Sequence, residues 1–196
     1  MPFDSSSLFR LTVTQYRRLF ELGILSAGSP IELLEGLLIE GMPRNPIDNP
    51  ATRTFEEIVQ KGLPGEWQLG RSLIVALCES KPESAPEPDY VIVRTSAALD
   101  GKIPPRPTNI GVVIEIASSC PDLERVHLGR IYARAGVPVY WVFNFAIRIV
   151  EVFTQPSGPI DAPHYAKRAV YPIGTSVPVV LDGTTIGTIA VSDVMG

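Results

Sequence analysis

Cysteine and histidine are scarce in this sequence of 196 residues. The two cysteines, Cys78 and Cys120, form no CxxC motif and are too few for a disulfide framework, which favours a reduced, cytoplasmic setting. The two histidines, His127 and His164, have no zinc-ligand spacing between them. The scarcity of both residue types argues against a disulfide-stabilised secreted domain and against a zinc site.

Long apolar runs and a strong excess of positive charge are also missing. No hydrophobic stretch approaches the ~18 residues that cross a bilayer, and the first ten residues lack a cationic start followed by an apolar core. We therefore expect no membrane span and no secretory signal. The formal net charge of -4 argues against a protein that mainly wraps nucleic acid. It does not exclude a nuclease, because carboxylate-lined metal sites are themselves acidic.

The composition is that of a single folded domain covering residues 1–196. Hydrophobic residues make up 45% of the chain, which predicts a substantial core. No repeat, linker or low-complexity tract divides the sequence, and its 19 prolines and 16 glycines separate short elements instead.

The N-terminal third contains signals for two helices and a hairpin. Thr12 and Gln15 fit a capping box, and the apolar stripe that follows ends at Gly23, so this segment is predicted to be a helix. "IELLEGLLIE" is typical of a hairpin with its Glu-Gly pair at the turn. A second helix is expected over residues 52–62.

From residue 66 onward, β-branched and aromatic runs between turn residues predict strands. These runs are "WQLGRSLIVALC", "DYVIV", "GVVIEIA", "VYWVFN" and "RIVEVFT". A helical segment, with Pro121 in its first turn and Gly136 at its end, lies between the predicted strands "GVVIEIA" and "VYWVFN". A helix that connects two strands in this way implies that the two strands are parallel. The earlier strands lack a crossover helix and are expected to be antiparallel, and Asp182-Gly183 predicts a later hairpin. The predicted fold is one α/β domain with a mixed sheet.

Acidic residues occur where apolar ones are expected. Glu115 lies inside "GVVIEIA", and a carboxylate there costs several kcal/mol unless something pairs with it. Asp89 opens the preceding strand, so antiparallel pairing would bring the two carboxylates together. Glu32 lies in a third apolar segment, the first strand of the predicted hairpin "IELLEGLLIE". Three carboxylates around one cavity suit Mg²⁺ or Mn²⁺.

Structural explanations of the same residues stay open. Arg71 or Arg148 could neutralise Glu115 in an ion pair, because structural networks also hold buried charges. Asp89 could cap a turn, and Glu32 could be an ordinary acid at a strand edge. Cys120 is better explained as a small buried thiol than as a nucleophile, because nothing in the sequence orients a histidine towards it.

Five motifs follow one another along the chain: "LTVTQYRRLF", "IELLEG", "PEPDYVIVR", "GVVIEIASS" and "IYARAGVPVYWVFN". In this order and spacing they resemble a large bacterial family of restriction-endonuclease-like proteins in the PD-(D/E)XK phosphodiesterase superfamily. The resemblance covers a core of about residues 11–153 and, weakly, the C-terminal strands at 154–196. It implies a restriction-endonuclease-like fold, with a mixed sheet of four or five core strands flanked by helices.

The resemblance also implies site residues. Glu32, Asp89 and Glu115 match the acids of the family's catalytic site, and Asp89 and Glu115 match its metal ligands. In the superfamily such acids bind one or two Mg²⁺ ions, which activate a water for attack on a phosphodiester. No organic cofactor is implied.

The family's lysine is missing. The superfamily places it two residues after Glu115, where this chain has Ala117, and the family moves it to four residues before Tyr132, where this chain has Leu128. Arg125, on nearly the same helix face as Leu128, could substitute as a cation. We otherwise expect Arg125, Arg130 and Arg134 to form a solvated helix face.

The sequence thus predicts a Mg²⁺-dependent endonuclease acting on nucleic acid, DNA being the expected substrate, with activity weakened at Leu128. One alternative is a catalytically degenerate nuclease fold that serves as a binding or assembly protein. Another is a metal-dependent hydrolase of a small phosphate compound. A homodimer is the expected assembly, since nucleases of this architecture often pair to reach both strands.

Overall fold

The computed structural model describes residues 8–26, 28–41, 50–97, 99, 103–117 and 122–195, and everything below concerns these ranges. The helices are α1 (Val13–Glu21), α2 (Pro50–Gly62), α3 (Asp122–Ala135) and α4 (Val191–Met195), with a 3-10 turn at Pro107–Asn109. The first strands are β1 (Ile31–Leu34), β2 (Leu37–Glu40), β3 (Trp67–Arg71), β4 (Tyr90–Arg94) and β5 (Ile110–Ala117). The others are β6 (Val139–Asn144), β7 (Ile149–Pro156), β8 (Tyr165–Pro172), β9 (Ser176–Leu181) and β10 (Thr184–Ala190). None of the described helices is long and apolar enough to cross a membrane.

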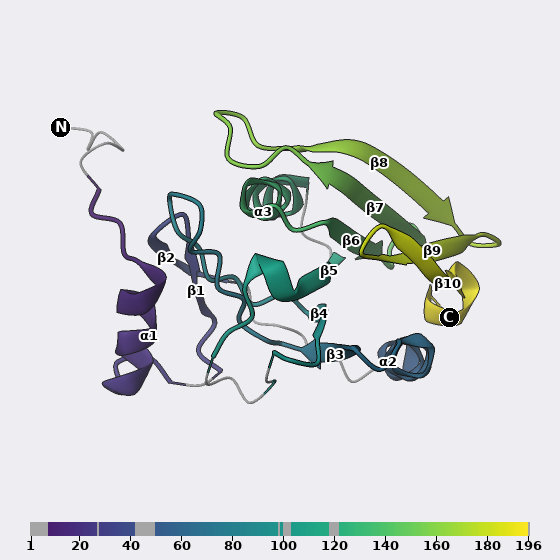
Figure 1. The fold of residues 1–196 in the computed structure, drawn as a ribbon, viewed down its shortest axis with the longest axis horizontal. Helices are drawn as coiled ribbons and strands as arrows, with labels where there is room; N and C mark the ends of the chain where they lie inside the picture. The colour runs from purple at the N-terminus through teal and green to yellow at the C-terminus, as the bar shows by residue number, and fades with distance from the viewer. Residues whose placement is uncertain are drawn as a thin grey trace.

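A six-stranded mixed sheet forms the centre of the molecule (Figure 1). Its strand order is β3-β4-β5-β6-β7-β8, and only the β5–β6 pair is parallel. The α3 helix connects the parallel pair, as the sequence predicted, because a parallel connection must return across the sheet. The sheet has more strands than the four or five expected, because β8 extends it beyond β7.

The two predicted hairpins are present outside this sheet. β1 pairs with β2, and β9 pairs with β10, each in an antiparallel hairpin. Glu35 and Gly36 both have positive φ angles, as do Asp182 and Gly183, which is the conformation that a two-residue hairpin turn requires. Local turn chemistry therefore determined both hairpins.

The α1 helix begins and ends at the predicted signals. Thr12 is its N-cap, and Thr12 and Gln15 form the reciprocal hydrogen bonds of a capping box. Gly23 follows the helix with a φ of 68°, which suits a residue without Cβ. Tyr16 and its neighbours on the apolar face pack in a small cluster with β1, which attaches this hairpin to the helix.

The "WQLGRSLIVALC" segment differs from the prediction. Its strand ends at Arg71, because Ser72 has a φ of 44° and leaves the extended conformation. Leu73, Val75 and Leu77 are nevertheless buried, so their alternating pattern reflects packing of an irregular segment against the sheet. Hydrophobic alternation alone could not distinguish the two structures.

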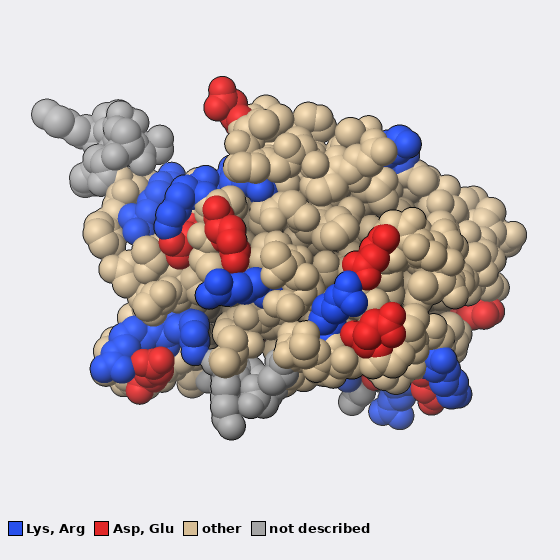
Figure 2. All heavy atoms as spheres, viewed as in Figure 1, with Lys and Arg blue, Asp and Glu red and all other residues tan. Residues whose placement is uncertain are grey.

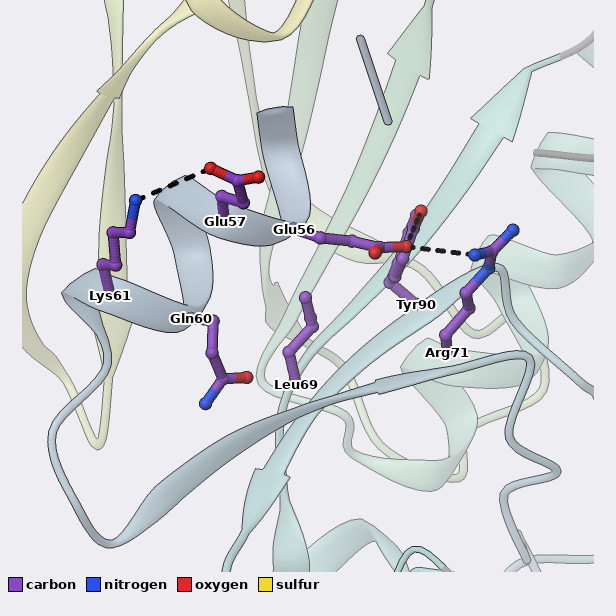
Figure 3. A pocket seen from close by; sticks show the side chains of 7 residues that line it. All are labelled: Glu56, Glu57, Gln60, Lys61, Leu69, Arg71 and Tyr90. Carbon is purple, nitrogen blue, oxygen red and sulfur yellow. Dashed lines mark hydrogen bonds and ion pairs between the residues drawn. The ribbon is translucent and has the colours of Figure 1, made fainter. Parts of the chain in front are cut away.

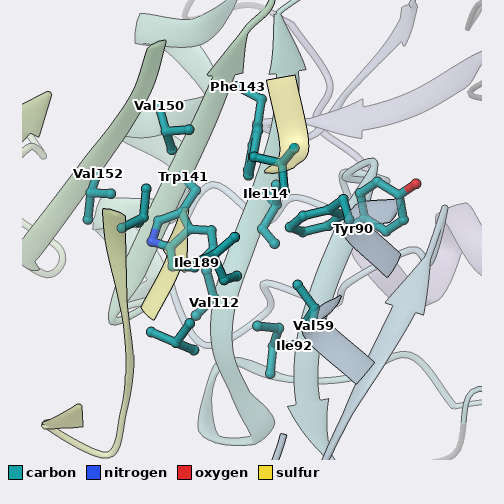
Figure 4. Close-up of a cluster of buried hydrophobic side chains, with 14 of the residues drawn as sticks. Val59, Tyr90, Ile92, Val112, Ile114, Trp141, Phe143, Val150, Val152 and Ile189 are labelled. Atoms are coloured by element: carbon teal, nitrogen blue, oxygen red, sulfur yellow. The ribbon is translucent and has the colours of Figure 1, made fainter. Parts of the chain in front are cut away.

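The two faces of the sheet are covered by different elements. One face packs against α2, α4 and the β9–β10 hairpin in a large apolar cluster that includes Ile114, Trp141 and Phe143 (Figure 4). The other packs against α3 and includes Val113, Tyr132 and Tyr140. Consecutive residues of a strand point to opposite faces, so each central strand contributes to both clusters.

Gly111 shows how closely the first face is packed. A Cβ at this position would lie 2.5 Å from a side-chain atom of Leu181 and 2.9 Å from the ring of Trp67. The register of β4 against β5 also shifts here, between the pairs that Ile92 and Val93 form. Glycine is therefore required at the start of β5 for the β9–β10 hairpin to approach the sheet.

Candidate functional site

Asp89 and Glu115 come together through the pairing of β4 with β5. Tyr90 is the register partner of Ile114, so continuing this antiparallel register by one residue sets Asp89 opposite Glu115. Residues directly opposite across such a pair have Cβ atoms about 4.5–5.5 Å apart. A hydrogen bond of 2.7 Å from the backbone N–H of Ile116 to Oδ2 of Asp89 fixes this carboxylate against β5. The two acids are thus neighbours, although 26 positions separate them in the sequence.

Glu115 points to the α3 face of the sheet and meets a tyrosine there. The hydroxyl of Tyr132 donates a hydrogen bond of 2.8 Å to Oε1 of Glu115. Tyr132 is fully buried. Burial and the negative charge of Glu115 raise the pKa of Tyr132 well above its ordinary value, so the hydroxyl keeps its proton and acts as a donor. A neutral donor therefore accounts for part of the stabilisation of the half-buried Glu115 carboxylate.

Arg71 lies on the opposite face from Glu115. It is the register partner of Tyr90, whose side chain belongs to the apolar cluster beneath α2. Its guanidinium lies 3.4 Å from a carboxylate oxygen of Glu56, on α2. This position gives no support to the structural explanation in which Arg71 neutralises Glu115. Arg148 lies in the turn between β6 and β7.

Glu32 approaches the same region from β1. After burial, the charge of Glu32 is the largest cause of the raised pKa of Tyr16, and it is a lesser cause of the raised pKa of Tyr132. The negative charges of Glu32 and Glu115 thus both contribute to the raised pKa of Tyr132, and only Glu115 forms a hydrogen bond with its hydroxyl. Within the described ranges, no group of three or more His, Cys, Asp or Glu side chains has the arrangement of a metal site.

The donor chemistry of the Asp89–Glu115 pair fits a hard divalent cation. Both residues offer carboxylate oxygens, the ligands that Mg²⁺ and Mn²⁺ prefer. Two carboxylates on facing strands repel each other, and a cation between them relieves that repulsion. The residues present therefore fit the metal that the sequence implied.

Leu128 occupies the helix face that Tyr132 occupies. It lies four residues before Tyr132, is half-buried, and packs against the cluster between α3 and the sheet. A lysine at this position would extend towards the same side of α3 as the tyrosine hydroxyl. The leucine supplies an apolar surface there instead of a charge.

The arginines of α3 do not all form the expected solvated face. Arg130 is exposed, but only 10% of the Arg134 side chain is exposed, and its guanidinium lies 2.6 Å from Oε1 of Glu35. Nε2 of His127 lies 4.0 Å from the other oxygen of Glu35. The prediction was wrong for Arg134 because the turn of the β1–β2 hairpin covers this side of the helix. The side chain of Arg125 lies outside the described part of the structure, as do Cys120 and Pro121.

Sequence reasoning missed a further acid on the α3 face. Glu151 of β7 is fully buried, and it lies in one register row with Glu115, separated from it only by Val142 of β6. Nε of Arg168, on β8, donates a hydrogen bond of 2.8 Å to Oε1 of Glu151. The signal in the sequence was the same as for Glu115, a glutamate inside the β-branched and aromatic run "RIVEVFT".

Surface charge is mixed on the face of the molecule that Figure 2 shows. Figure 2 shows acidic and basic side chains interspersed over the side of the molecule that carries α1 and α2, whereas the surface over β9 and β10 is mostly uncharged. This distribution agrees with the small net negative charge of the chain.

A family model described as "Uma2: Putative restriction endonuclease" matches residues 13–187. The chain belongs to the Uma2 family. The match includes β1, β4, β5 and α3, so all the elements that carry the candidate site lie within it. The comparison with curated proteins found no match.

A solved structure supports the fold of this Uma2 member. It is the crystal structure of a putative nuclease belonging to DUF820 from Anabaena variabilis ATCC 29413. The TM-score is 0.57 at 16% sequence identity, and the similarity covers 90% of this chain and 96% of that one. The mixed sheet flanked by helices is therefore an architecture that the two chains share.

Proposed function

We propose that this protein is a Mg²⁺-dependent endonuclease that hydrolyses phosphodiester bonds in DNA. The observation that carries the proposal is the opposition of Asp89 and Glu115 on adjacent strands, within a chain of the Uma2 family. Asp89 and Glu115 would hold the metal. When bound, Mg²⁺ would supply a water of lowered pKa and stabilise charge on the phosphoryl oxygens.

The protein's own residues prepare the site for that chemistry. The Ile116 N–H orients the Asp89 carboxylate, and the Tyr132 hydroxyl orients that of Glu115. Glu32, on β1, is the third acid of the proposed catalytic site, and its negative charge contributes to the raised pKa of Tyr132. Preorganised carboxylates lose little freedom on binding a cation.

A second candidate function is that of a nuclease fold which binds without cleaving. The observation that favours it is Leu128, because an apolar side chain stands where the family resemblance places a lysine. A leucine can neither polarise a water nor contact a phosphate. Electrostatic groups of that kind are worth a factor of about 10² to 10³ in rate.

Nicking of supercoiled plasmid DNA in Mg²⁺, Mn²⁺ or EDTA tests both candidates. We expect slow, metal-dependent nicking by the wild type, no nicking by Asp89→Asn, and a gain of about 10²-fold or more in Leu128→Lys. Leu128→Lys combined with Glu115→Ala is the inactive control, and thermal melts verify that each variant is folded. Tight Mn²⁺ binding by calorimetry without nicking by the wild type or by Leu128→Lys would refute the nuclease and support the binding protein.

A further inference from the structure

The turn of the β1–β2 hairpin is attached to three other segments of the chain through one residue, Glu35. Its Oε1 lies 2.6 Å from the guanidinium of Arg134, on α3, and its other carboxylate oxygen lies 4.0 Å from Nε2 of His127, on the same helix. The backbone N–H of Glu35 donates a hydrogen bond of 2.9 Å to the hydroxyl of Ser84, and its carbonyl accepts one from Arg10. The turn is therefore held to α3 and also to the segments that precede α1 and β4.

Glutamate is an unusual residue for this position in a hairpin. Glu35 has a φ of 50°, and two-residue turns favour asparagine, aspartate or glycine there, because larger side chains are strained at positive φ. The corresponding residue of the β9–β10 hairpin is Asp182. A glutamate carries its carboxylate one methylene further from the backbone than an aspartate does, and in this turn the carboxylate reaches Arg134. The strained residue thus has a specific contact, which motivates a functional hypothesis.

The Glu35–Arg134 pair is largely shielded from water. Only 10% of the Arg134 side chain and 26% of the Glu35 side chain are exposed. Removing one partner of a buried ion pair is far more disruptive than breaking a pair on the surface, because the remaining charge loses its counter-charge. The pair therefore connects the hairpin to α3 more strongly than a surface ion pair would.

The same hairpin carries Glu32, the third acid of the proposed site. Leu33 is fully buried in the cluster with α1, whereas Leu34 packs against the cluster between the sheet and α3. Alternate residues of a strand point to the same side, so Glu32 lies on the side of Leu34. The charge of Glu32 also contributes to the raised pKa of Tyr132, on α3. A movement of the hairpin away from α3 would therefore displace Glu32 from the proposed site.

We propose that Arg134 positions Glu32 for catalysis by holding the Glu35 turn against α3. The hydroxyl of Tyr132, on the same helix, donates to Glu115, so α3 sets the position of an acid from β5 and of an acid from β1. Arg134 is a positioning residue, because it acts through Glu35 and does not have to touch the substrate. This inference rests on the proposed function, since Glu32 is one of its proposed catalytic acids.

Plasmid nicking by Arg134→Gln measures the effect. We expect kcat to fall about 10-fold, because small displacements of a catalytic group are costly. The KM for the plasmid and the affinity for Mn²⁺ should stay at their wild-type values, since Asp89 and Glu115 do not belong to the hairpin. Arg134→Lys, which keeps the positive charge, should recover part of the loss. In a Glu32→Gln background, Arg134→Gln should cause no further loss, because the acid that it positions is already missing.

Arg71→Gln is the matched control. The guanidinium of Arg71 lies 3.4 Å from a carboxylate oxygen of Glu56 on the opposite face of the sheet, and a dashed line in Figure 3 marks this pair. The substitution makes the same charge change and breaks another ion pair between a helix and a strand, and it leaves the hairpin untouched. We expect an unchanged kcat. An equal loss in Arg71→Gln and Arg134→Gln, or a loss in Arg134→Gln that adds fully to that of Glu32→Gln, overturns the proposal.

Hydrogen exchange provides a readout that does not depend on cleavage. Arg134→Gln should accelerate exchange of the β1–β2 amides about 10-fold while those of β4 and β5 stay protected, and Arg71→Gln should have no such effect. Glu35→Gln should reproduce the acceleration, and it keeps the test valid if loss of the buried arginine impairs folding. Unchanged exchange of the hairpin in both variants overturns the proposal. Faster exchange without nicking, in wild type and in Leu128→Lys, supports the attachment of the hairpin by Arg134 and refutes only the nuclease.

Discussion

The two faces of the central sheet are built from alternate residues of the same strands, yet they differ in chemistry. The face beneath α2, α4 and the β9–β10 hairpin is an apolar cluster that includes Ile114, Trp141 and Phe143. The face beneath α3 contains Glu115 and Glu151 in one register row, and Asp89 lies beside Glu115. Ile114 and Glu115 are neighbours in sequence and belong to opposite faces.

One face of the sheet is thus apolar, whereas the other combines an apolar cluster with the acids of the proposed site. Burial of apolar side chains stabilises the fold in proportion to the area removed from water. Removing a carboxylate from water, fully for Glu151 and partly for Glu115, costs free energy, which the donors Arg168 and Tyr132 reduce. We infer that the apolar face stabilises the sheet sufficiently for the α3 face to retain its acids. Substitutions at neighbouring positions test this division.

Glu115→Ala should have the largest effect on the α3 face. We expect it to abolish Mn²⁺ binding and nicking while the melting temperature stays the same or rises, because repulsion among the carboxylates disappears. Calorimetry with Mn²⁺ and a thermal melt provide the measurements. Unfolding of the variant, together with absence of metal binding by the wild type, would show that Glu115 has a structural role.

Ile114→Ala, one residue away, should instead lower stability and leave metal binding unchanged. It removes a fully buried side chain from the apolar face, which typically costs about 2–5 kcal/mol of unfolding free energy. Urea denaturation measures this loss. Among molecules that remain folded, Mn²⁺ affinity should equal that of wild type, and a large drop in affinity would contradict the division between the faces.

Tyr132→Phe examines the donor that orients Glu115. The ring is retained and only the hydroxyl is lost, so we expect a folded protein with Mn²⁺ affinity lowered about 10- to 100-fold, as for other residues that orient metal ligands. Calorimetry provides the affinity. Tyr165→Phe is a matched control, since its buried hydroxyl donates instead to the backbone oxygen of Val137. Equal affinity in both variants would mean that Tyr132 does not position the carboxylate.

Glu83→Gln should have the smallest effect, outside both faces. Burial alone would raise the pKa of Glu83, but hydrogen bonds from Lys81 and from the backbone N–H of Val13, at the start of α1, outweigh it and lower the pKa below 4.5. A lowered pKa in the folded state stabilises the protein above the unfolded pKa, and this contribution disappears as pH falls through the folded value.

The substitution should therefore lower stability by about 1 kcal/mol near neutral pH and by less in acid. Urea denaturation from about pH 7 to about pH 3 measures the difference between variant and wild type. A difference that is independent of pH would mean that the charge of Glu83 contributes nothing.

Local patterns in the sequence predicted much of the fold and part of the site. The capping box at Thr12, the turn at Glu35–Gly36 and the crossover helix depend on residues close in sequence, so the sequence specifies them directly. The glutamate inside "GVVIEIA" likewise marked a position that needs a partner. Antiparallel pairing of the two strands predicted that Glu115 would lie beside Asp89, and the observed register agrees with that expectation.

Contacts between distant segments could not be predicted in this way. No local pattern indicated that Tyr132 would donate to Glu115, that the hairpin would cover Arg134, or that β8 would supply Arg168 to Glu151. Each contact depends on which side of a helix or strand faces another element. Small rotations or a register shift of one residue would change all three.

The sequence by itself determined most of the elements, their order and the acids at the ends and centres of the strands; the exception is the irregular segment after Arg71. These features follow from local backbone preferences and from the period of the apolar residues. Only the tertiary structure decided that Asp89 and Glu115 share a face with Tyr132 while Arg71 lies on the other. The reason is physical: hydrogen bonds and ion pairs act over a few ångströms in space, and packing of the sheet between α3 and α2 sets which side chains come within that distance.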